Sequence, residues 1–257
     1  MKPVLAMPYH DPDGRWSAHL EKVTPLLKTI FEAVYLGVTP QTQVALPELV
    51  SSLQADPFFH LSFAPMGSQV GDHCLAAYRQ AVQNCQPEQV IHLAYFDRIT
   101  FILETEQQEA FTAEMRRLDS AGSPVLYMRT TAAWAVHPRN YYDCEMMATR
   151  AGELLFGVSL DYCWCHCAAT AAQLAPLLGR IRSHDFGVQA ELAILLRKSL
   201  TTTFVDWLTW EDPYLEGRDP LELKREREAS LTETHKRLGY VIPIMAVLLN
   251  YSKEVNS

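Results

Sequence analysis

The sequence predicts an α/β protein in which a largely parallel sheet is covered by helices on both faces. Short β-prone runs alternate with helical segments of about ten to fifteen residues, which is the pattern of successive βαβ units. Apolar residues make up 48% of the 257 residues and charged residues 20%, as in an ordinary globular protein with a substantial core. We expect residues 1–212 to form this domain. Residues 213–257 are expected to form a helical extension packed on it, because the charged first half of this tail is followed by an apolar half.

The first half of the chain is predicted to contain four strands and the helices between them. The β-prone run PVLAMPY is followed by the turn formers HDPDG, and a helix then begins at Ser17, whose hydroxyl can cap it. Apolar residues return at three-and-four spacing from Val70 to Ala81, which indicates an amphipathic helix. The predicted strands are 3–9, 32–39, 58–65 and 90–96, and the predicted helices are 17–30, 46–54 and 67–85.

The second half continues the alternation. The segment 106–122 has a polar start and ends at Gly122, as helices often do. The remaining predicted strands are 124–134, 161–169 and 201–210, and the remaining predicted helices are 144–157, 170–178, 186–200 and 219–251.

Three alternating cysteines, Cys163, Cys165 and Cys167, lie in DYCWCHCAAT with His166 between the last two. They are compatible with a soft-metal site or with one buried face of a strand. Structural zinc sites usually separate paired cysteines by two to four residues, and free cysteine is often buried. The pattern therefore favours the strand face.

Charge and motif content exclude several classes of function. The formal net charge is -8 and no basic run occurs, which argues against a nucleic-acid partner. No apolar stretch reaches the roughly 18 residues of a membrane span, and the N-terminus lacks the features of a signal peptide, so we expect a cytoplasmic protein. The G-x-G-x-x-G of dinucleotide enzymes and the G-x-S-x-G of nucleophilic hydrolases are both missing.

Asp97 and Arg98 interrupt the apolar run VIHLAYFDRITFILE. A buried charge costs several kcal/mol unless it is paired or bound, so this pair needs a partner. The predicted strand ends here, and parallel sheets bind ligands at the carboxyl ends of their strands. The two side chains either hold a cation and a phosphate or pair with neighbours to tie down a loop.

The order of the elements and four short motifs resemble the GT-A fold of nucleotide-sugar glycosyltransferases over residues 1–212. The motifs are PVLAMPYHDPDG, GDHCLAAYRQAV, AYFDR and HDFGVQAELAILLRKSLTTTFVDW. In that family an Asp-x-Asp motif at the end of a central strand holds a divalent cation on the diphosphate. Here Tyr95 replaces the first aspartate and Asp97 remains. The resemblance implies a rossmann-related, mostly parallel sheet and a divalent cation, manganese or magnesium, on Asp97.

The resemblance also implies a nucleotide pocket and an acceptor side. Gly71 would let the backbone approach a ligand, and a guanidinium can bind phosphate bidentately. The residues assigned to the nucleotide pocket are Pro8, Tyr9, His10, Gly71, Asp72, Arg79, Asp97 and Arg98. Asp185 is assigned as the base or acceptor-binding group, and the substrate side also includes His184, Trp210, Glu211 and Asp212.

Each assignment has a structural alternative. Asp72 and Asp185 can cap helices, Arg79 and Arg98 can face solvent, and tryptophans in a strand are more often core than sugar platforms. The expected function is transfer of a sugar from a nucleotide-diphosphate sugar to an acceptor. The alternative is an inactive protein of the same fold that binds a sugar or nucleotide or serves as an interaction partner, because the motif lacks one acidic ligand.

Overall fold

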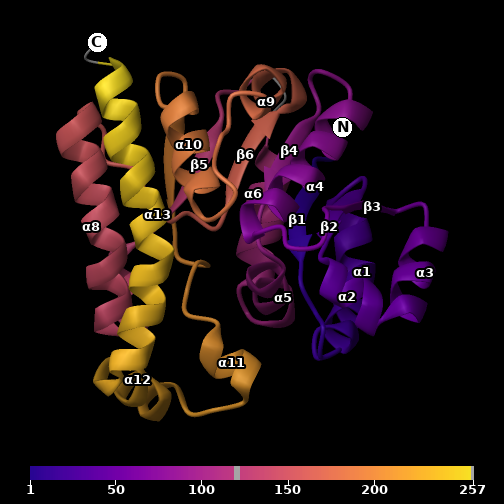
Figure 1. The fold of residues 1–257 in the computed structure, drawn as a ribbon. Helices are drawn as coiled ribbons and strands as arrows, with labels where there is room; N and C mark the ends of the chain where they lie inside the picture. Colours follow the sequence, from indigo (N-terminus) through magenta and orange to yellow (C-terminus); the bar gives the residue numbers. More distant parts are fainter. Residues whose placement is uncertain (119–121, 256–257) are drawn as a thin grey trace. The chain divides into compact units, whose positions relative to one another are not determined.

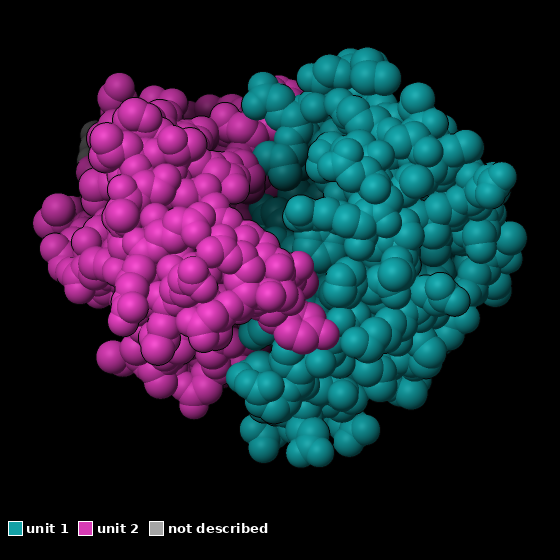
Figure 2. Space-filling view, turned by 90° about the horizontal axis from the view of Figure 1, so that it is seen from below, with its two compact units in different colours: residues 1–124, 165–180 teal, residues 125–164, 181–257 magenta. Residues whose placement is uncertain are grey.

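The computed structural model describes residues 1–118 and 122–255, and it divides into two compact units (Figure 2). Unit 1 comprises residues 1–124 and 165–180, and unit 2 comprises residues 125–164 and 181–257. The helices that follow residue 212 belong to the same unit as residues 125–164. The expected division into a domain 1–212 and an extension 213–257 stays a prediction.

Unit 1 contains five strands of the seven-stranded sheet, in the order β3-β2-β1-β4-β6. Neighbouring strands are parallel except β4 and β6, which run antiparallel with Leu93 opposite Cys167. The strands are β1 (Val4–Tyr9), β2 (Val34–Val38), β3 (Phe59–Phe63), β4 (Val90–Leu93) and β6 (Cys167–Thr170). Strands β1, β2 and β4 are buried along their whole length, as continuous apolar runs in covered parallel sheets are.

Seven helices accompany this sheet among the described residues of unit 1 (Figure 1). They are α1 (Ser17–Ile30), α2 (Pro40–Ala45), α3 (Pro47–Ala55), α4 (Val70–Asn84), α5 (Phe96–Glu104), α6 (Gln108–Arg117) and α9 (Ala171–Leu178). Helix α4 crosses the sheet at Gly37 of β2. A Cβ at Gly37 would lie 1.9 Å from the carbonyl oxygen of His73, so only glycine permits this approach.

Unit 2 contains the parallel strands β5 (Val125–Arg129) and β7 (Thr201–Val205), with Val125 opposite Thr201. Its helices are α7 (Thr131–Val136), α8 (Arg139–Phe156), α10 (Gly187–Leu196), α11 (Asp212–Glu216), α12 (Pro220–Ala229) and α13 (Leu231–Val255). The long helices α8 and α13 lie side by side, and α10 also packs on α13 (Figure 1).

The predicted class, a mostly parallel α/β sheet flanked by helices, is confirmed. Most predicted strands and helices are present with shifted ends, and α2, α7 and α11 are additional short helices. The predicted end of the helix 106–122 includes residues 119–121, which lie outside the described residues; α6 ends at Arg117.

Three predictions of local structure were wrong. The strand predicted over 90–96 ends at Leu93, and Phe96 instead begins helix α5, an element that was not predicted. Of the alternating cysteines only Cys167 lies in a strand, and Cys163 and Cys165 precede it in an irregular segment. The predicted long helix 219–251 is two helices, because Ser230 ends α12 and its hydroxyl then accepts a hydrogen bond from the backbone N–H of Glu233 at 3.2 Å.

Among the described residues, no helix combines the length and the apolar character that crossing a bilayer demands.

Candidate functional site

The carboxyl ends of β1, β2 and β4 place polar side chains at one edge of the sheet in unit 1. His10 follows β1, Thr39 follows β2, and Asp97 lies four residues beyond Leu93, the last residue of β4. Because these strands are parallel, their carboxyl ends share an edge, which is where open α/β sheets bind ligands.

A hydrogen-bonded chain joins the ends of β1 and β2. The Nδ1 atom of His10 lies 2.9 Å from the hydroxyl oxygen of Thr39, and that oxygen lies 2.9 Å from the hydroxyl oxygen of Thr42. Thr42 in turn accepts a hydrogen bond from the backbone N–H of Asp11 at 2.6 Å. His10 is exposed, and the hydrogen bond to Thr39 fixes the orientation of its imidazole. A side chain that contacts a ligand needs both properties.

Asp11 is a structural carboxylate. It is only 1% exposed, and it accepts hydrogen bonds from the Tyr9 hydroxyl, the Ser17 hydroxyl and the backbone N–H of Trp16 at 3.0–3.1 Å. Burial, and then the nearby Asp11, raise the pKa of Tyr9 far above its usual range, so the phenol keeps its proton and donates it. Pro8 and Tyr9 are therefore buried in β1 and support the turn that presents His10.

Asp97 is a half-buried side chain in the first turn of α5. Its neighbour Phe96 packs edge-on against Tyr9, with ring centroids 5.0 Å apart, which fixes the start of the helix next to the end of β1. Within the described residues, the hydrogen bond of the Asp97 carboxylate is to the backbone N–H of Arg98, with Oδ1 accepting at 2.9 Å. The carboxylate keeps the capacity to bind more ligands.

Arg98 and Tyr95, which flank Phe96 and Asp97, both have positions that the sequence did not predict. Arg98 is 8% exposed, so it is a buried side chain of α5 and not a solvated arginine at a strand end. The hydroxyl of Tyr95 lies 4.0 Å from the sulfur of Cys74, and burial raises the pKa of the phenol well above its usual range. A protonated phenol facing Cys74 does not replace the missing carboxylate of the motif.

The polar residues of α4 have partners inside the protein. Asp72 completes a capping box, accepting a hydrogen bond from the backbone N–H of Gln69 at 3.0 Å. Arg79 is exposed and its Nη2 donates to the carbonyl of Leu178 at 3.3 Å. Gly71 is buried in the first turn of the helix.

His73 is a polar residue of α4 that sequence reasoning missed. It is 4% exposed, burial is the main cause that lowers its pKa, and its Nδ1 has no hydrogen-bond partner among the described residues. The neighbouring Asp72 carboxylate opposes this effect and raises the pKa of His73. The signal for His73 was its place directly after Gly71 and Asp72, two residues already assigned to the pocket.

In unit 2, the predicted acidic motif organises the segment before α10. Asp185 accepts a hydrogen bond from the backbone N–H of Gly187 at 2.8 Å, as a residue near a helix start does. Glu191, 2% exposed, accepts from the backbone N–H groups of Arg182 and Ser183 at 2.9 Å each. Asp185 is half-buried and His184 is exposed, so both remain accessible.

The predicted sugar platform is largely core. Trp210 and Glu211 are each 5% exposed, and the Trp210 ring meets Tyr141 of α8 edge-on at 6.4 Å. Asp212 is half-buried and begins α11. The substrate-binding assignment of these three residues stays a prediction.

A buried ionic cluster lies at the carboxyl end of β5. Arg129 contacts Glu145 of α8 at 3.0 Å and Asp161 at 3.1 Å, and all three side chains are less than a tenth exposed. Ligand atoms of Glu145, Asp161 and Cys163 lie within 4.8 Å of one another, the spacing of a metal site. The guanidinium already supplies positive charge to both carboxylates, so the cluster satisfies itself as an ion pair network.

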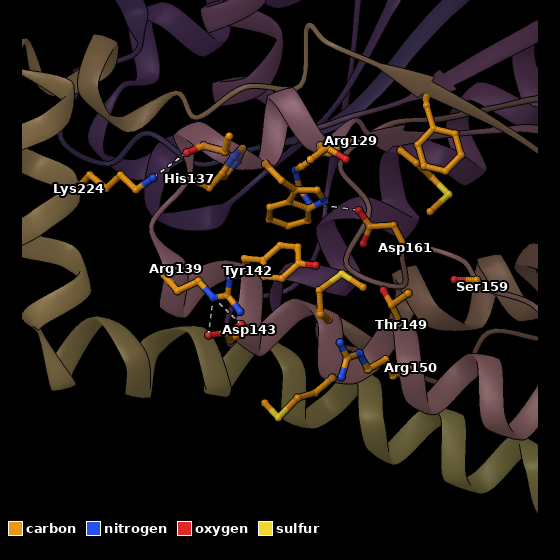
Figure 3. A pocket seen from close by; sticks show the side chains of 17 residues that line it. Arg129, His137, Arg139, Tyr142, Asp143, Thr149, Arg150, Ser159, Asp161 and Lys224 are labelled. Carbon is orange, nitrogen blue, oxygen red and sulfur yellow. Dashed lines mark hydrogen bonds and ion pairs between the residues drawn. The ribbon is translucent and has the colours of Figure 1, made fainter.

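A pocket of about 790 Å³ opens beside this cluster, and all its lining residues belong to unit 2 (Figure 3). Sequence reasoning missed it because its residues come from separate segments of the chain. The lining side chains are Met128, Arg129, Thr131, Trp134, Ala135, His137, Arg139, Tyr142, Asp143, Met146, Met147, Thr149, Arg150, Ser159, Asp161, Phe204 and Lys224.

No protein-family model and no curated protein matches the chain. Glucosyl-3-phosphoglycerate synthase from Mycobacterium tuberculosis is similar in structure. Its complex with Mn²⁺, uridine diphosphate and phosphoglyceric acid aligns with a TM-score of 0.52 and 10% identity over 98% of this chain and 78% of that one. A second crystal structure of the synthase aligns with a TM-score of 0.51 and 12% identity over 97% of this chain and 80% of that one.

The 4-diphosphocytidyl-2C-methyl-D-erythritol synthase from Anaerococcus prevotii aligns with a TM-score of 0.46 and 7% identity over 93% of this chain and 96% of that one. The two likenesses to the mycobacterial synthase show the fold alone at such identities. They confirm the predicted GT-A-like α/β fold.

Proposed function

We propose that this protein transfers a sugar from a nucleotide-diphosphate sugar to an acceptor, with a divalent cation on Asp97. The observation that carries the proposal is the position of Asp97. It is a half-buried carboxylate in the first turn of α5, just beyond β4, and its one hydrogen bond within the described residues is to a neighbouring backbone N–H. The GT-A-like fold supports a nucleotide at this edge of the sheet.

The residues present fit a hard cation held by few protein ligands. Magnesium and manganese take oxygen ligands, and one carboxylate with waters and phosphate oxygens is a sufficient set. When bound, such a cation neutralises charge that develops on a diphosphate leaving group. The hydrogen bond between His10 and Thr39 at 2.9 Å supports a role for His10 as the nucleotide contact from the end of β1.

Asp185 is the proposed acceptor-side group. A general base must lie within hydrogen-bond reach of the hydroxyl that attacks, and Asp185 is half-buried rather than sealed. Its Oδ1 accepts from the N–H of Gly187, which orients the carboxylate and leaves the second oxygen for an acceptor hydroxyl. The remaining predicted pocket residues, including Arg98 and Arg79, are proposed as support for the diphosphate side.

The test is binding of nucleoside diphosphates in the presence of Mn²⁺, measured by calorimetry with Asp97→Asn. We expect the affinity of the preferred nucleotide to fall at least about tenfold, equivalent to about 1.4 kcal/mol. Glu32→Gln is the control, because Glu32 is exposed and precedes β2, at the opposite end of the same strands. Equal affinity of wild type and Asp97→Asn would reject the assigned role.

A non-catalytic binding protein of the same fold is the second candidate. The observation that favours it is Tyr95, whose phenol faces Cys74 and leaves Asp97 as the one acidic residue of the motif. Incubation with a panel of nucleotide sugars and Mn²⁺ separates the two candidates. A transferase releases nucleoside diphosphate when its acceptor, or water, takes the sugar, whereas a binding protein shows thermal stabilisation without release.

A further inference from the structure

We infer that the pocket of unit 2 is a binding site for an organic anion, a phosphate, sulfate or carboxylate attached to a flat apolar group. The inference stands apart from the proposed function, because every residue that lines the pocket belongs to unit 2 and binding is measured without a nucleotide sugar.

The charges around the pocket leave a positive excess. Four lining side chains are arginine or lysine and two are aspartate. Asp161 contacts Arg129 at 3.1 Å, and Asp143 contacts Arg139 at 2.9 Å, so both aspartates already have cationic partners. Glu145 does not line the pocket but contacts both Arg129 and Arg237, so this pair adds one negative and one positive charge nearby.

Arg150 and Lys224 are the two cations that this pairing leaves over. Lys224 donates to the carbonyl of Ala135 at 2.7 Å, and Glu228 is bound nearby to the backbone N–H of Arg139. Arg150 is exposed and makes no hydrogen bond or ion pair within the part of the chain that the structure describes. The Arg150 end is therefore the more positive one.

The Arg150 end also carries hydroxyl donors. In the close-up, Arg150 lies on the same side as Thr149 and Ser159, whereas Lys224 and His137 lie on the other side (Figure 3). A guanidinium together with hydroxyl groups is the donor set that binds a phosphate, sulfate or carboxylate in proteins. This end is the proposed anion subsite.

The rest of the pocket is lined by aromatic and methionine side chains. Tyr142 lies between the two ends of the pocket in the close-up (Figure 3), and its ring meets Trp134 edge-on at 5.2 Å. Phe204 is 61% exposed and Met147 is 45% exposed, so both present apolar surface that a flat apolar group can contact. The volume of about 790 Å³ is within the range of about 300–1,000 Å³ that small-molecule sites have.

The probe is 1-naphthyl phosphate, titrated into the full-length chain without metal and followed by ligand-detected NMR and thermal unfolding. We expect it to bind and to raise the unfolding temperature, whereas 1-naphthol and inorganic phosphate, each lacking half of the ligand, bind at least about tenfold more weakly. Replacing the phosphate by carboxylate or sulfate on the same ring shows which anion the site prefers.

Arg150→Gln identifies the site. This exposed substitution is expected to leave the unfolding temperature of the free protein unchanged and to weaken 1-naphthyl phosphate at least about tenfold. Arg225→Gln, an exposed change on α12 outside the pocket lining, should leave binding unchanged. The inference is overturned if the probe does not bind, if Arg150→Gln binds as wild type does, or if Asp97→Asn rather than Arg150→Gln abolishes binding.

Discussion

Among single residues, two buried histidines form a titratable pair in the core. His92 of β4 and His166 are both fully buried, and Nε2 of His92 lies 2.9 Å from Nδ1 of His166. Phe31 and Phe111 pack around His92, with ring centroids 6.2 and 5.7 Å away. Burial lowers the pKa of His92 from 6.5 to about 3, so the imidazole is neutral in the folded protein.

The buried imidazole predicts a loss of stability in acid. Below pH 6.5 the unfolded chain binds a proton at His92 that the folded protein refuses until about pH 3, so stability falls as the pH falls through this window. Between pH 7 and pH 5 the loss from this residue is about 2 kcal/mol. Urea unfolding at the two pH values measures it.

His92→Gln tests the assignment because glutamine keeps hydrogen-bonding atoms and does not titrate. The difference in unfolding free energy between pH 7 and pH 5 should be about 2 kcal/mol smaller in the variant than in wild type, whatever the absolute stability of the variant. His235→Gln, an exposed change on α13, should keep the wild-type difference. If His92→Gln retains the full difference, another group causes the acid sensitivity.

Residue types near strand ends were predictable from the sequence, but their partners were not. Asp97 was recognised because a charge interrupts an apolar run, and it is indeed half-exposed just beyond β4. Asp72 was assigned to a ligand with a helix cap as the alternative, and the structure gives it a capping partner. His73 and Thr39 carried no pattern of their own, because their significance depends on which strand ends are neighbours in the sheet.

At the scale of elements, fully buried segments were the hardest to predict. Residues 98–103 of α5 are all buried, so no polar face marks a helical period, and the β-branched and aromatic residues favour a strand. The cysteine segment failed for a different reason. Trp164 donates to the carbonyl of Gln189 at 2.8 Å and Asp161 accepts from the backbone N–H of Cys163, so tertiary contacts hold the segment in an irregular path.

The contact between α4 and β2 predicts that Gly37→Ala is costly. The added methyl group would lie 1.9 Å from the carbonyl oxygen of His73 and 2.8 Å from its carbonyl carbon, both backbone atoms that cannot rotate away. Helix α4 must shift, so we expect a loss of about 1–3 kcal/mol in the free energy of unfolding in urea. Because Gly71 and Asp72 of the proposed nucleotide pocket move with the helix, nucleotide affinity should fall as well.

Gly179→Ala is the matched control for this substitution. No atom lies within 4 Å of a Cβ built at Gly179, so stability and binding should stay within about 0.5 kcal/mol of wild type. A Gly37→Ala protein as stable as Gly179→Ala would mean that α4 tolerates a wider spacing from the sheet than its position indicates.

At the scale of the whole molecule, each unit has its own means of stabilisation. Unit 1 is organised around a buried, mostly parallel part of the sheet. Unit 2 has two strands, and its helices are joined by a chain of charged and polar contacts. Arg237 of α13 contacts Glu145 at 3.0 Å and lies over the ring of Tyr141 at 3.9 Å, and the Tyr141 hydroxyl donates to Glu233 at 2.7 Å.

The alternation of strands and helices was enough to predict the α/β class and its likeness to the GT-A fold, because that pattern is local in the sequence. The grouping of residues 125–164 with the C-terminal helices was not predictable in the same way. Glu145 contacts Arg129, 16 residues before it, and Arg237, 92 residues after it, and no local pattern shows that these side chains meet.

The buried ionic network around Arg129 is expected to be the stabilising centre of unit 2. Arg129→Met removes a guanidinium that lies between Glu145 and Asp161 and is 2% exposed, so two buried carboxylates lose a partner. Breaking a buried pair on one side typically costs about 3–5 kcal/mol, and we expect a loss of this size in urea unfolding. Hydrogen exchange of peptides from α8 and α13 should show that the loss is concentrated in unit 2.

Two further variants distinguish this explanation from loss of packing alone. Arg139→Met breaks the exposed pair with Asp143, whose side chains are 72% and 54% exposed, and should cost less than about 1 kcal/mol. Adding Asp161→Asn to Arg129→Met removes one uncompensated charge, so the double variant should recover part of the lost stability. If Asp161→Asn instead adds its own penalty to that of Arg129→Met, the cost of losing Arg129 comes from its packing over Trp134 at 4.3 Å and not from its charge.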